Sequence, residues 1–247
     1  SQMTLSFNEY ILPLKLERIL KNKNLNVSYT GNNTYEIAYK SKCKIKAESI
    51  ILSKGGGYIA GDNCLIKKTS TKLYAALSDG MGSGLKAYEA SKALLKRLEG
   101  LINLPYDDEK IIRLLTELIS LFTSSYATLD FFSANLATKK GKLFKIASST
   151  SLLIRNNQIK EFNTKTLPID FDGILDLYEI DLEKNDIILL MSDGVFDFSN
   201  IKALYSYILS ISYLEPDKLV YNIAKYIFNE SNKKLHDDTS ILAIKVY

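Results

Sequence analysis

The sequence has few of the residues on which several protein classes depend. Its 247 residues include two cysteines, Cys43 and Cys64, and one histidine, His236. Neither cysteine has a C-x-x-C partner or the spacing of a zinc site. We therefore expect two reduced thiols in or near strands, as is usual in a cytosolic protein.

Long apolar runs and a strong charge of one sign are also missing. No stretch reaches the roughly 18 apolar residues of a membrane helix, so we expect this chain itself not to contact a membrane. The formal net charge is only +4 and the lysines are dispersed, which predicts no nucleic-acid partner. Glu9 and Lys15 interrupt the early apolar run, so the N-terminus does not resemble a secretory signal.

The pattern along the chain predicts many strands with paired helices inserted between them. A helix is expected within residues 5–21, followed by a hairpin around the turn Gly31-Asn32-Asn33. Further strands are expected at 44–53, 63–68, 73–77, in several segments of 129–190, and at 239–246, and helices at 85–102, 107–124, 200–212 and 216–229. Strand does not alternate regularly with helix, so the expected fold class is an α+β layered sandwich rather than a doubly wound sheet.

Four aspartates lie where strands meet loops, each beside a glycine or another acid. They are Asp62, Asp79, Asp193 and Asp237, and Asp238 follows the last of them. A buried strand that carries a carboxylate to its end is costly unless a cation waits there, and hard divalent cations prefer oxygen ligands. Asp-Gly is also a common turn dipeptide, so any one of these sites alone is better explained as a turn. The tripeptide Ser-Asp-Gly occurs twice after an apolar strand, which favours a metal site.

The order of these motifs resembles that of the PPM-type metal-dependent protein phosphatases, and among them the branch that acts in sporulation. The series that carries the resemblance is GGGYIAGDN, LSDGMGSGLKAYEAS, YATLDFFSANL, LFKIASSTSLLI, LPIDF, IILLMSDGVFD and HDDTSILAIKV. It implies a PPM-type four-layer α/β/β/α sandwich over residues 43–247. Residues 1–42, an N-terminal helix and β-hairpin, resemble the segment just upstream of that domain.

The resemblance also implies a catalytic and metal-binding set. Asp79 would bridge two ions, Mn²⁺ or Mg²⁺, with Asp62 and the carbonyl of Gly80 on the first and with Asp193 and Asp237 on the second. Asp238 would lie outside the ligand set. Such a site hydrolyses phosphoserine or phosphothreonine by water attack and needs no phosphoenzyme. The chain departs from relatives at Ala60–Asn63 and at Ser148–Leu152, where a glycine and a proline are missing from a turn.

The same likeness implies partners and a cellular setting. The substrate would be a phosphorylated anti-sigma-factor antagonist, whose dephosphorylation activates a sporulation sigma factor. The chain would be a cytoplasmic domain of a protein anchored in the membrane upstream, and it would self-associate through the N-terminal helix. The helices within 85–124 correspond to a regulatory switch.

Three alternatives remain at this point. The first is a degenerate phosphatase-like domain that acts as a protein-binding regulatory module, although all four aspartates are retained. The second is a dinucleotide loop at Gly80-x-Gly82-x-Gly84, which Asp79 and the absence of a following parallel strand disfavour. The third gives His236 a role as proton donor, but a lone surface histidine before a strand is the simpler interpretation.

Overall fold

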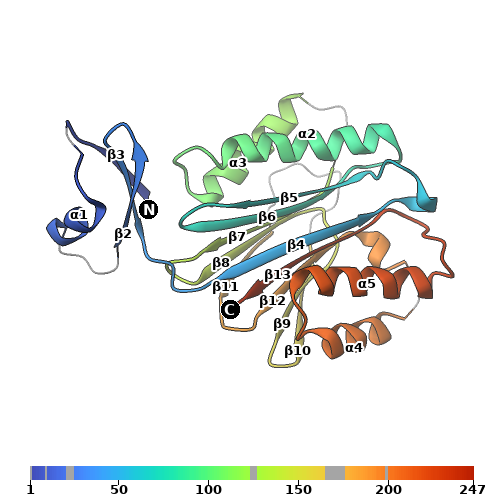
Figure 1. Ribbon diagram of the computed structural model, residues 1–247. Helices are drawn as coiled ribbons and strands as arrows, with labels where there is room; N and C mark the ends of the chain where they lie inside the picture. Colours follow the sequence, from blue (N-terminus) through green and yellow to red (C-terminus); the bar gives the residue numbers. More distant parts are fainter. Residues whose placement is uncertain (1, 9, 21–24, 123–126, 165–175, 198–199) are drawn as a thin grey trace.

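The structure is a computed structural model that describes residues 2–8, 10–20, 25–122, 127–164, 176–197 and 200–247 (Figure 1). The LPIDF motif at 167–171 and the expected end of the second long helix near Ser124 lie outside the described residues.

Two antiparallel sheets form the body of the molecule. One has the strand order β10-β9-β12-β13-β4 and the other the order β11-β8-β7-β6-β5. The strands of the first are β4 (Ile45–Leu52), β9 (Ser151–Arg155), β10 (Gln158–Phe162), β12 (Ile187–Met191) and β13 (Thr239–Val246). Those of the second are β5 (Asp62–Lys68), β6 (Lys72–Asp79), β7 (Leu129–Asn135), β8 (Lys140–Ile146) and β11 (Asp176–Asp181).

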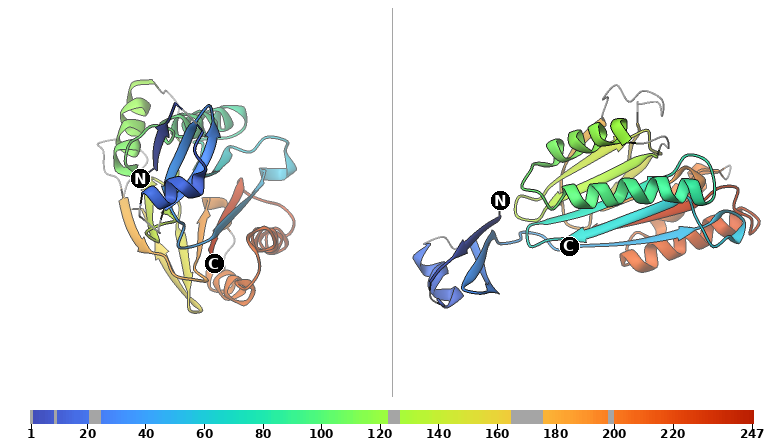
Figure 2. Two further views of the ribbon diagram at one scale, coloured as in Figure 1. Left: turned by 60° about the vertical axis from the view of Figure 1, so that its left-hand side comes forward. Right: turned by 90° about the horizontal axis from the view of Figure 1, so that it is seen from above.

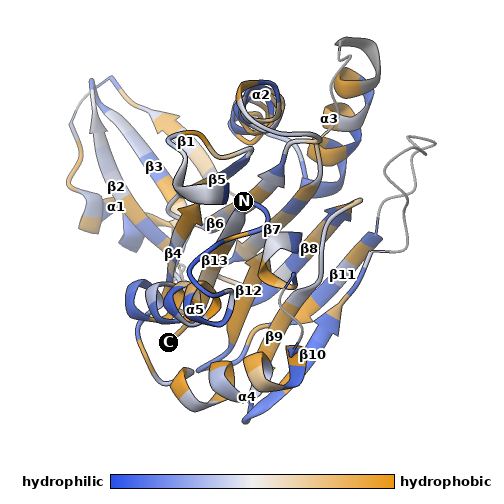
Figure 3. Ribbon diagram, turned by 90° about the vertical axis from the view of Figure 1, so that its right-hand side faces the viewer, coloured by the Kyte–Doolittle hydropathy of each residue, from blue (hydrophilic) through white to orange (hydrophobic). Residues whose placement is uncertain are grey.

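Helices cover the outer face of each sheet. The helices α2 (Leu85–Leu101) and α3 (Asp108–Phe122) pack on β6, β7 and β8, and α4 (Ile201–Ile211) and α5 (Pro216–Glu230) pack on β9, β12 and β13. Figure 3 looks along the sandwich and shows both sheets between the two pairs of helices. The predicted four-layer α/β/β/α sandwich is therefore confirmed.

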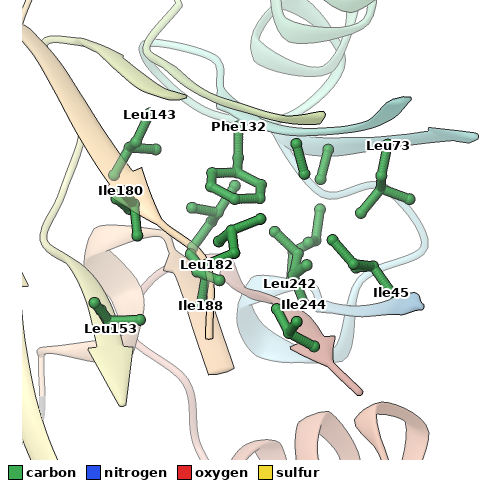
Figure 4. Packing of buried hydrophobic residues seen from close by; sticks show 14 of the residues in the cluster. Ile45, Leu73, Phe132, Leu143, Leu153, Ile180, Leu182, Ile188, Leu242 and Ile244 are labelled. Atoms are coloured by element: carbon green, nitrogen blue, oxygen red, sulfur yellow. The ribbon is translucent and has the colours of Figure 1, made fainter. Parts of the chain in front are cut away.

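The largest core lies between the two sheets. Phe132 of β7, Leu242 of β13 and Ile188 of β12 are fully buried there (Figure 4). Alternate residues of the same strands point outward and join the helices, as Leu189 and Ala243 do beneath α4 and α5. Because both faces of β12 and β13 are covered, β12 consists wholly of apolar residues and every residue of β13 is buried.

The N-terminal residues form a separate small unit that contains the predicted helix and hairpin. The strands β1 (Gln2–Ser6), β2 (Leu25–Gly31) and β3 (Thr34–Tyr39) make a three-stranded sheet, on which α1 (Pro13–Ile19) packs. The hairpin and a helix within residues 5–21 are both confirmed, but the strand β1 that precedes the helix was not predicted. Leu5 pairs with Tyr35 in the sheet, and the helix begins only at Pro13, whose ring suits the first helical turn.

This N-terminal unit projects from one end of the sandwich (Figures 1 and 2). Its own core consists of Leu16, Val27, Tyr35 and Ile37. The backbone of Lys42 then joins the body through a 2.7 Å hydrogen bond to the carbonyl of Leu136. In the described part of the chain, no helix is long and apolar enough to cross a membrane.

The motif-bearing strand ends meet at the opposite end of the sandwich. β6 ends at Asp79 and β5 begins at Asp62 beside it. On the facing sheet, β12 ends just before Ser192 and β13 begins just after Asp238. The turns at the other end, such as Thr69–Lys72, carry none of the predicted site residues.

Candidate metal centre

Asp62 and Asp79 lie directly opposite each other in the antiparallel pair of β5 and β6. The chain fixes Asp79 further through Thr128, whose N–H donates to the Asp79 carbonyl at 2.7 Å. The Thr128 hydroxyl accepts a hydrogen bond from the Asp79 N–H at 3.2 Å. Two carboxylates are therefore held side by side by backbone pairing, before any ligand is considered.

Asp62 is a buried carboxylate that forms no ion pair with any described residue. The residue is only 2% exposed. Neither of its carboxylate oxygens has a hydrogen-bond partner of normal geometry among the described residues. The buried hydroxyls of Ser78 and Ser240 are also without partners within the described chain. A buried oxygen without a hydrogen-bond partner raises the free energy of the folded state. Such oxygens are rare in well-packed regions of proteins.

The pKa values of these acids reflect mutual repulsion in a dry environment. Burial, followed by the charges of Asp62 and Asp193, raises the pKa of Asp79 to about 8. Burial also raises the pKa of Asp62, although the nearby hydroxyls of Ser240 and Ser192 offset part of the shift. For Asp193, burial and then the charge of Asp237 raise the pKa. The acids are therefore close enough to disfavour one another's ionisation in the absence of a cation.

Asp193 and Asp237 come from the facing sheet. The 3₁₀ turn η2 (Asp193–Val195) follows β12, and Asp237 lies in the turn before β13. The Ser192 N–H donates to the Ser240 carbonyl at 3.0 Å, and the Ser192 hydroxyl accepts from the Ser240 N–H at 2.8 Å. These bonds hold the two aspartate-bearing turns together.

Asp238 holds the loop that leads to Asp62. One of its carboxylate oxygens accepts the N–H of Lys54 at 2.7 Å, and the other accepts the N–H of Gly61. Lys54 begins η1 (Lys54–Gly56), the short turn formed by the triple-glycine segment. The sequence predicted that Asp238 lies outside the ligand set, and these contacts give it a structural role.

Two of the site's glycines are required by close packing. A Cβ on Gly80 would lie 1.9 Å from the carbonyl oxygen of Ala87 in α2, and one on Gly194 would lie 2.2 Å from the carbonyl oxygen of Asp238. The resemblance gave Gly80 a role only through its carbonyl, as a metal ligand. The structure adds that only glycine fits against the neighbouring backbone.

α2 contacts the site through residues that the motifs did not single out. The buried hydroxyl of Ser91 donates to the carbonyl of Gly61 and accepts the side-chain amide of Asn63 at 2.8 Å. Ser91 sits among the small residues of an amphipathic helix. The sequence signal that could have identified Ser91 is its position, as a small polar residue, on the predicted buried face of this helix.

A second buried acid nearby has its own cation. Asp130 of β7 and Lys145 of β8 are both 0% exposed and form a 2.5 Å ion pair. The hydroxyls of Ser148 and Ser151 donate to the two Asp130 oxygens. The sequence interpretation treated these serines as turn residues. A charged residue on each of two apolar strands was the available signal for a buried pair.

The donor set suits hard divalent cations, although it is not gathered as one group. Among the described residues, no three Asp, Glu, His or Cys side chains converge closely enough to form a ready metal-binding cluster. Asp62 and Asp79 lie opposite each other in one sheet, and the charges of Asp193 and Asp237 from the facing sheet also act on Asp79. Mg²⁺ and Mn²⁺ prefer oxygen ligands, which include carboxylates, backbone carbonyls and water. The unpartnered oxygens of Asp62 fit a cation there.

His236 lies exposed in the turn before Asp237. It lines a small pocket with Asp197 and Glu230 and has no described contact with Asp62 or Asp79. The contacts of His236 therefore give no support to the alternative in which it is the proton donor.

Comparison with known proteins places this arrangement in a family. The family model "Stage II sporulation protein E" matches residues 69–247. Stage II sporulation protein E of Bacillus subtilis is 31% identical over 153 residues, which is 59% of this chain and 18% of that protein. The chain thus spans less than a fifth of that relative's length.

Solved structures agree on the fold. The PP2C phosphatase domain of SpoIIE from Bacillus subtilis, with a fragment of its regulatory domain, superposes with a TM-score of 0.80 at 20% identity. That match covers 99% of this chain and 78% of the other. RsbX, solved in complex with magnesium, gives a TM-score of 0.64 at 18% identity and covers 90% of this chain and all of the other.

The family model covers well over half of the chain, including Asp79, Asp193 and Asp237, and the structure supplies the PP2C phosphatase fold that the motifs predicted. The chain therefore belongs to the stage II sporulation protein E family.

Proposed function

We propose that the domain is a metal-dependent protein-serine/threonine phosphatase that removes phosphate from a phosphoserine of an anti-sigma-factor antagonist and thereby activates a sporulation sigma factor. Family membership supports the phosphatase chemistry. The substrate and its consequence rest on likeness to relatives that are much longer than this chain.

The observation that carries the proposal is the pairing of Asp62 with Asp79. Backbone register holds the two carboxylates opposite each other, Asp62 is buried without a partner, and the pKa of Asp79 is raised to about 8. A protein gains nothing in stability from such an arrangement alone. Binding of divalent cations would turn the repulsion into attraction.

The residues would divide the work between two sites. Asp62, Asp79 and the Gly80 carbonyl would hold one ion, and Asp79, Asp193 and Asp237 would hold the other. When bound, two Mn²⁺ or Mg²⁺ ions activate a water for in-line attack and neutralise charge on the phosphoryl group. Asp238 would keep Gly61 and Asp62 in place through its bonds to the backbone.

The direct test is hydrolysis of a phosphoserine protein in Mn²⁺ and in chelator. Wild type should turn over only with the metal, and Asp79→Asn and Asp193→Asn should each lose about a thousandfold or more in kcat/KM. Asp181→Asn is a matched control, because Asp181 is an exposed surface aspartate that pairs with Lys140. Undiminished turnover by Asp79→Asn, with its fold intact by circular dichroism, would exclude the proposed site.

The binding-module alternative has one observation in its favour, which is that no three-ligand cluster is assembled among the described residues. Calorimetric titration separates the two readings. An active phosphatase should give a heat of Mn²⁺ binding, and Asp79→Asn should remove that heat. A degenerate module should bind its partner protein without metal and give no heat with Mn²⁺.

We further propose a cytoplasmic location for this domain, within a protein anchored upstream, and self-association through the N-terminal unit. Exposed Leu12, Leu14 and Ile19 on and beside α1 support the last point. Sedimentation of the wild type against Leu14→Lys tests it.

A further inference from the structure

A pocket lies beside the candidate metal centre, between the end of β4 and the C-terminal half of α5. Its volume is about 720 Å³. Its apolar walls come from Ile50 and Leu52 of β4 and from Tyr221, Ala224 and Phe228 of α5. Tyr221 and Phe228 are both exposed, so an apolar surface faces solvent here.

Three lysines surround this apolar surface. Lys225, Lys233 and Lys234 line the pocket, and no acidic side chain is among the described residues that do so. All three lysines are exposed. None of them forms an ion pair or a side-chain hydrogen bond with any described residue. Elsewhere on the sandwich, Lys142 pairs with Glu109. The pocket therefore combines an apolar wall with uncompensated positive charge.

The chain presents two of these lysines on a well-defined turn. After α5, the Lys233 N–H donates to the Phe228 carbonyl at 2.9 Å, and the Lys234 N–H donates to the Ser231 carbonyl at 3.1 Å. Asn232 and Lys233 both adopt positive φ, at 54° and 60°, which is uncommon away from glycine. The turn thus fixes where the charges lie rather than leaving them on a loose tail.

One wall of the pocket is shared with the metal centre. Ser53 and the triple glycine at 55–57 line it, and the adjacent Lys54 donates its N–H to Asp238. Asp238 also accepts the N–H of Gly61, which precedes Asp62. A molecule seated in the pocket would therefore lie against the loop that leads directly to the proposed ligand Asp62.

We propose that this pocket docks an acidic segment of the phosphoprotein substrate, one that inserts an apolar side chain between Tyr221 and Phe228 while its carboxylates face Lys225 and Lys234. The proposal rests on the phosphatase function argued above and adds a specificity site to it. Because the pocket is concave and half apolar, a protein segment fits it better than a phosphate backbone would.

The test compares two double variants with the same change of charge. The pocket pair, Lys225→Glu/Lys234→Glu, reverses two charges that line the pocket. The control pair, Lys184→Glu/Lys202→Glu, reverses the charges of two exposed lysines that do not line it. The pocket pair should raise KM for the phosphorylated antagonist about tenfold and leave kcat unchanged. The control pair should change KM less than about twofold. Phe228→Ala should raise KM about fivefold, because it removes the apolar contact.

Hydrolysis of p-nitrophenyl phosphate separates docking from catalysis, since that small ester has no peptide segment that could occupy the pocket. All of these variants should hydrolyse it at the wild-type rate. A pocket pair that leaves phosphoprotein KM unchanged, or a control pair that raises it equally, overturns the docking site while the phosphatase function stands. If wild type hydrolyses neither ester, the proposed function fails, and direct binding of the phosphoprotein to wild type and to the pocket pair decides the docking site alone.

Two further measurements address other occupants. Self-association that the pocket pair abolishes, measured by sedimentation, would assign the surface to a second copy of the chain and overturn the proposal. Cosedimentation with phosphatidylglycerol vesicles that the pocket pair abolishes would assign it to a lipid surface and overturn it as well. The proposal expects neither effect.

Discussion

Two buried carboxylate clusters lie near the same end of the sandwich and differ in their source of positive charge. Asp130 has Lys145 as a fully buried partner and receives two serine hydroxyls. Asp62 faces another aspartate, and its oxygens have no described partner. Asp130 lies two residues beyond Thr128, which binds the backbone of Asp79, so the clusters are neighbours along one strand end.

The difference separates a structural role from a functional one. A buried acid whose cation is encoded in the chain is complete when the chain folds. A buried acid beside another acid is incomplete, because folding alone leaves repulsion that only an added cation relieves. The predictions below test whether the clusters behave in these two ways.

The largest effect should come from removing the cation that the chain supplies. Lys145→Met keeps the side-chain volume but leaves Asp130 charged and without its ion pair, which should lower the free energy of unfolding by about 3–5 kcal/mol. Urea unfolding followed by circular dichroism measures the loss. The double variant Asp130→Asn/Lys145→Met should regain at least about half of it, and a double variant as unstable as the single one would contradict the ion-pair interpretation.

The next effect should come from supplying the missing cation to the other cluster. Mn²⁺ at a hundred times its dissociation constant should raise the free energy of unfolding by about 2.7 kcal/mol, because the ion binds only the folded chain. Asp62→Asn should lose most of this increment, and Asp181→Asn should keep it. An increment that survives in Asp62→Asn would place the stabilising ion elsewhere.

Most of the fold could be predicted from the sequence because periodicity and turn chemistry agree in the sandwich. The apolar run that becomes β13 and the amphipathic stretch that becomes α2 were both identified at nearly their observed bounds. The N-terminal helix lies within the predicted residues, but the strand β1 before it was not predicted, and Leu5 is held in that strand by Tyr35 of β3. That long-range pairing cannot be read from a local pattern.

The site was predictable as a set of aspartates but not as a set of contacts. The motifs named Asp62, Asp79, Asp193, Asp237 and Gly80, and the fold brings their strand ends together. Their roles as ligands stay a prediction. Ser91 and Lys145 lie within the quoted motifs, but the sequence assigned no role to them. Their importance comes from burial beside particular partners, which only the packed structure reveals.

Two buried serines provide a smaller and more local comparison. Ser151 donates to Asp130 and accepts from Lys145, so Ser151→Ala should cost about 2 kcal/mol, as expected for hydrogen bonds to charged groups. The Ser78 hydroxyl, in the strand that ends at Asp79, is buried without a described partner. Ser78→Ala should therefore change the free energy of unfolding by less than about 0.5 kcal/mol. Equal losses in urea unfolding would show that both hydroxyls are satisfied.

The last comparison is a pH dependence that comes from the acid cluster that has no basic partner among the described residues. In the folded chain the pKa of Asp79 is raised from 3.8 to about 8. Between those values the folded state binds more protons than the unfolded state, so stability contributed by this group is present at low pH and lost as pH rises. In chelator, ionisation of Asp79 should therefore lower the Tm as the pH rises from 5 to 8. Because other groups titrate in the same range, the decisive quantity is the difference between variants: Asp79→Asn should flatten this slope and Asp181→Asn should not. Mn²⁺ should reverse it, since the metal binds the ionised carboxylate and favours high pH. A wild-type slope matched by Asp79→Asn would mean that Asp79 is already balanced by the chain, as Asp130 is.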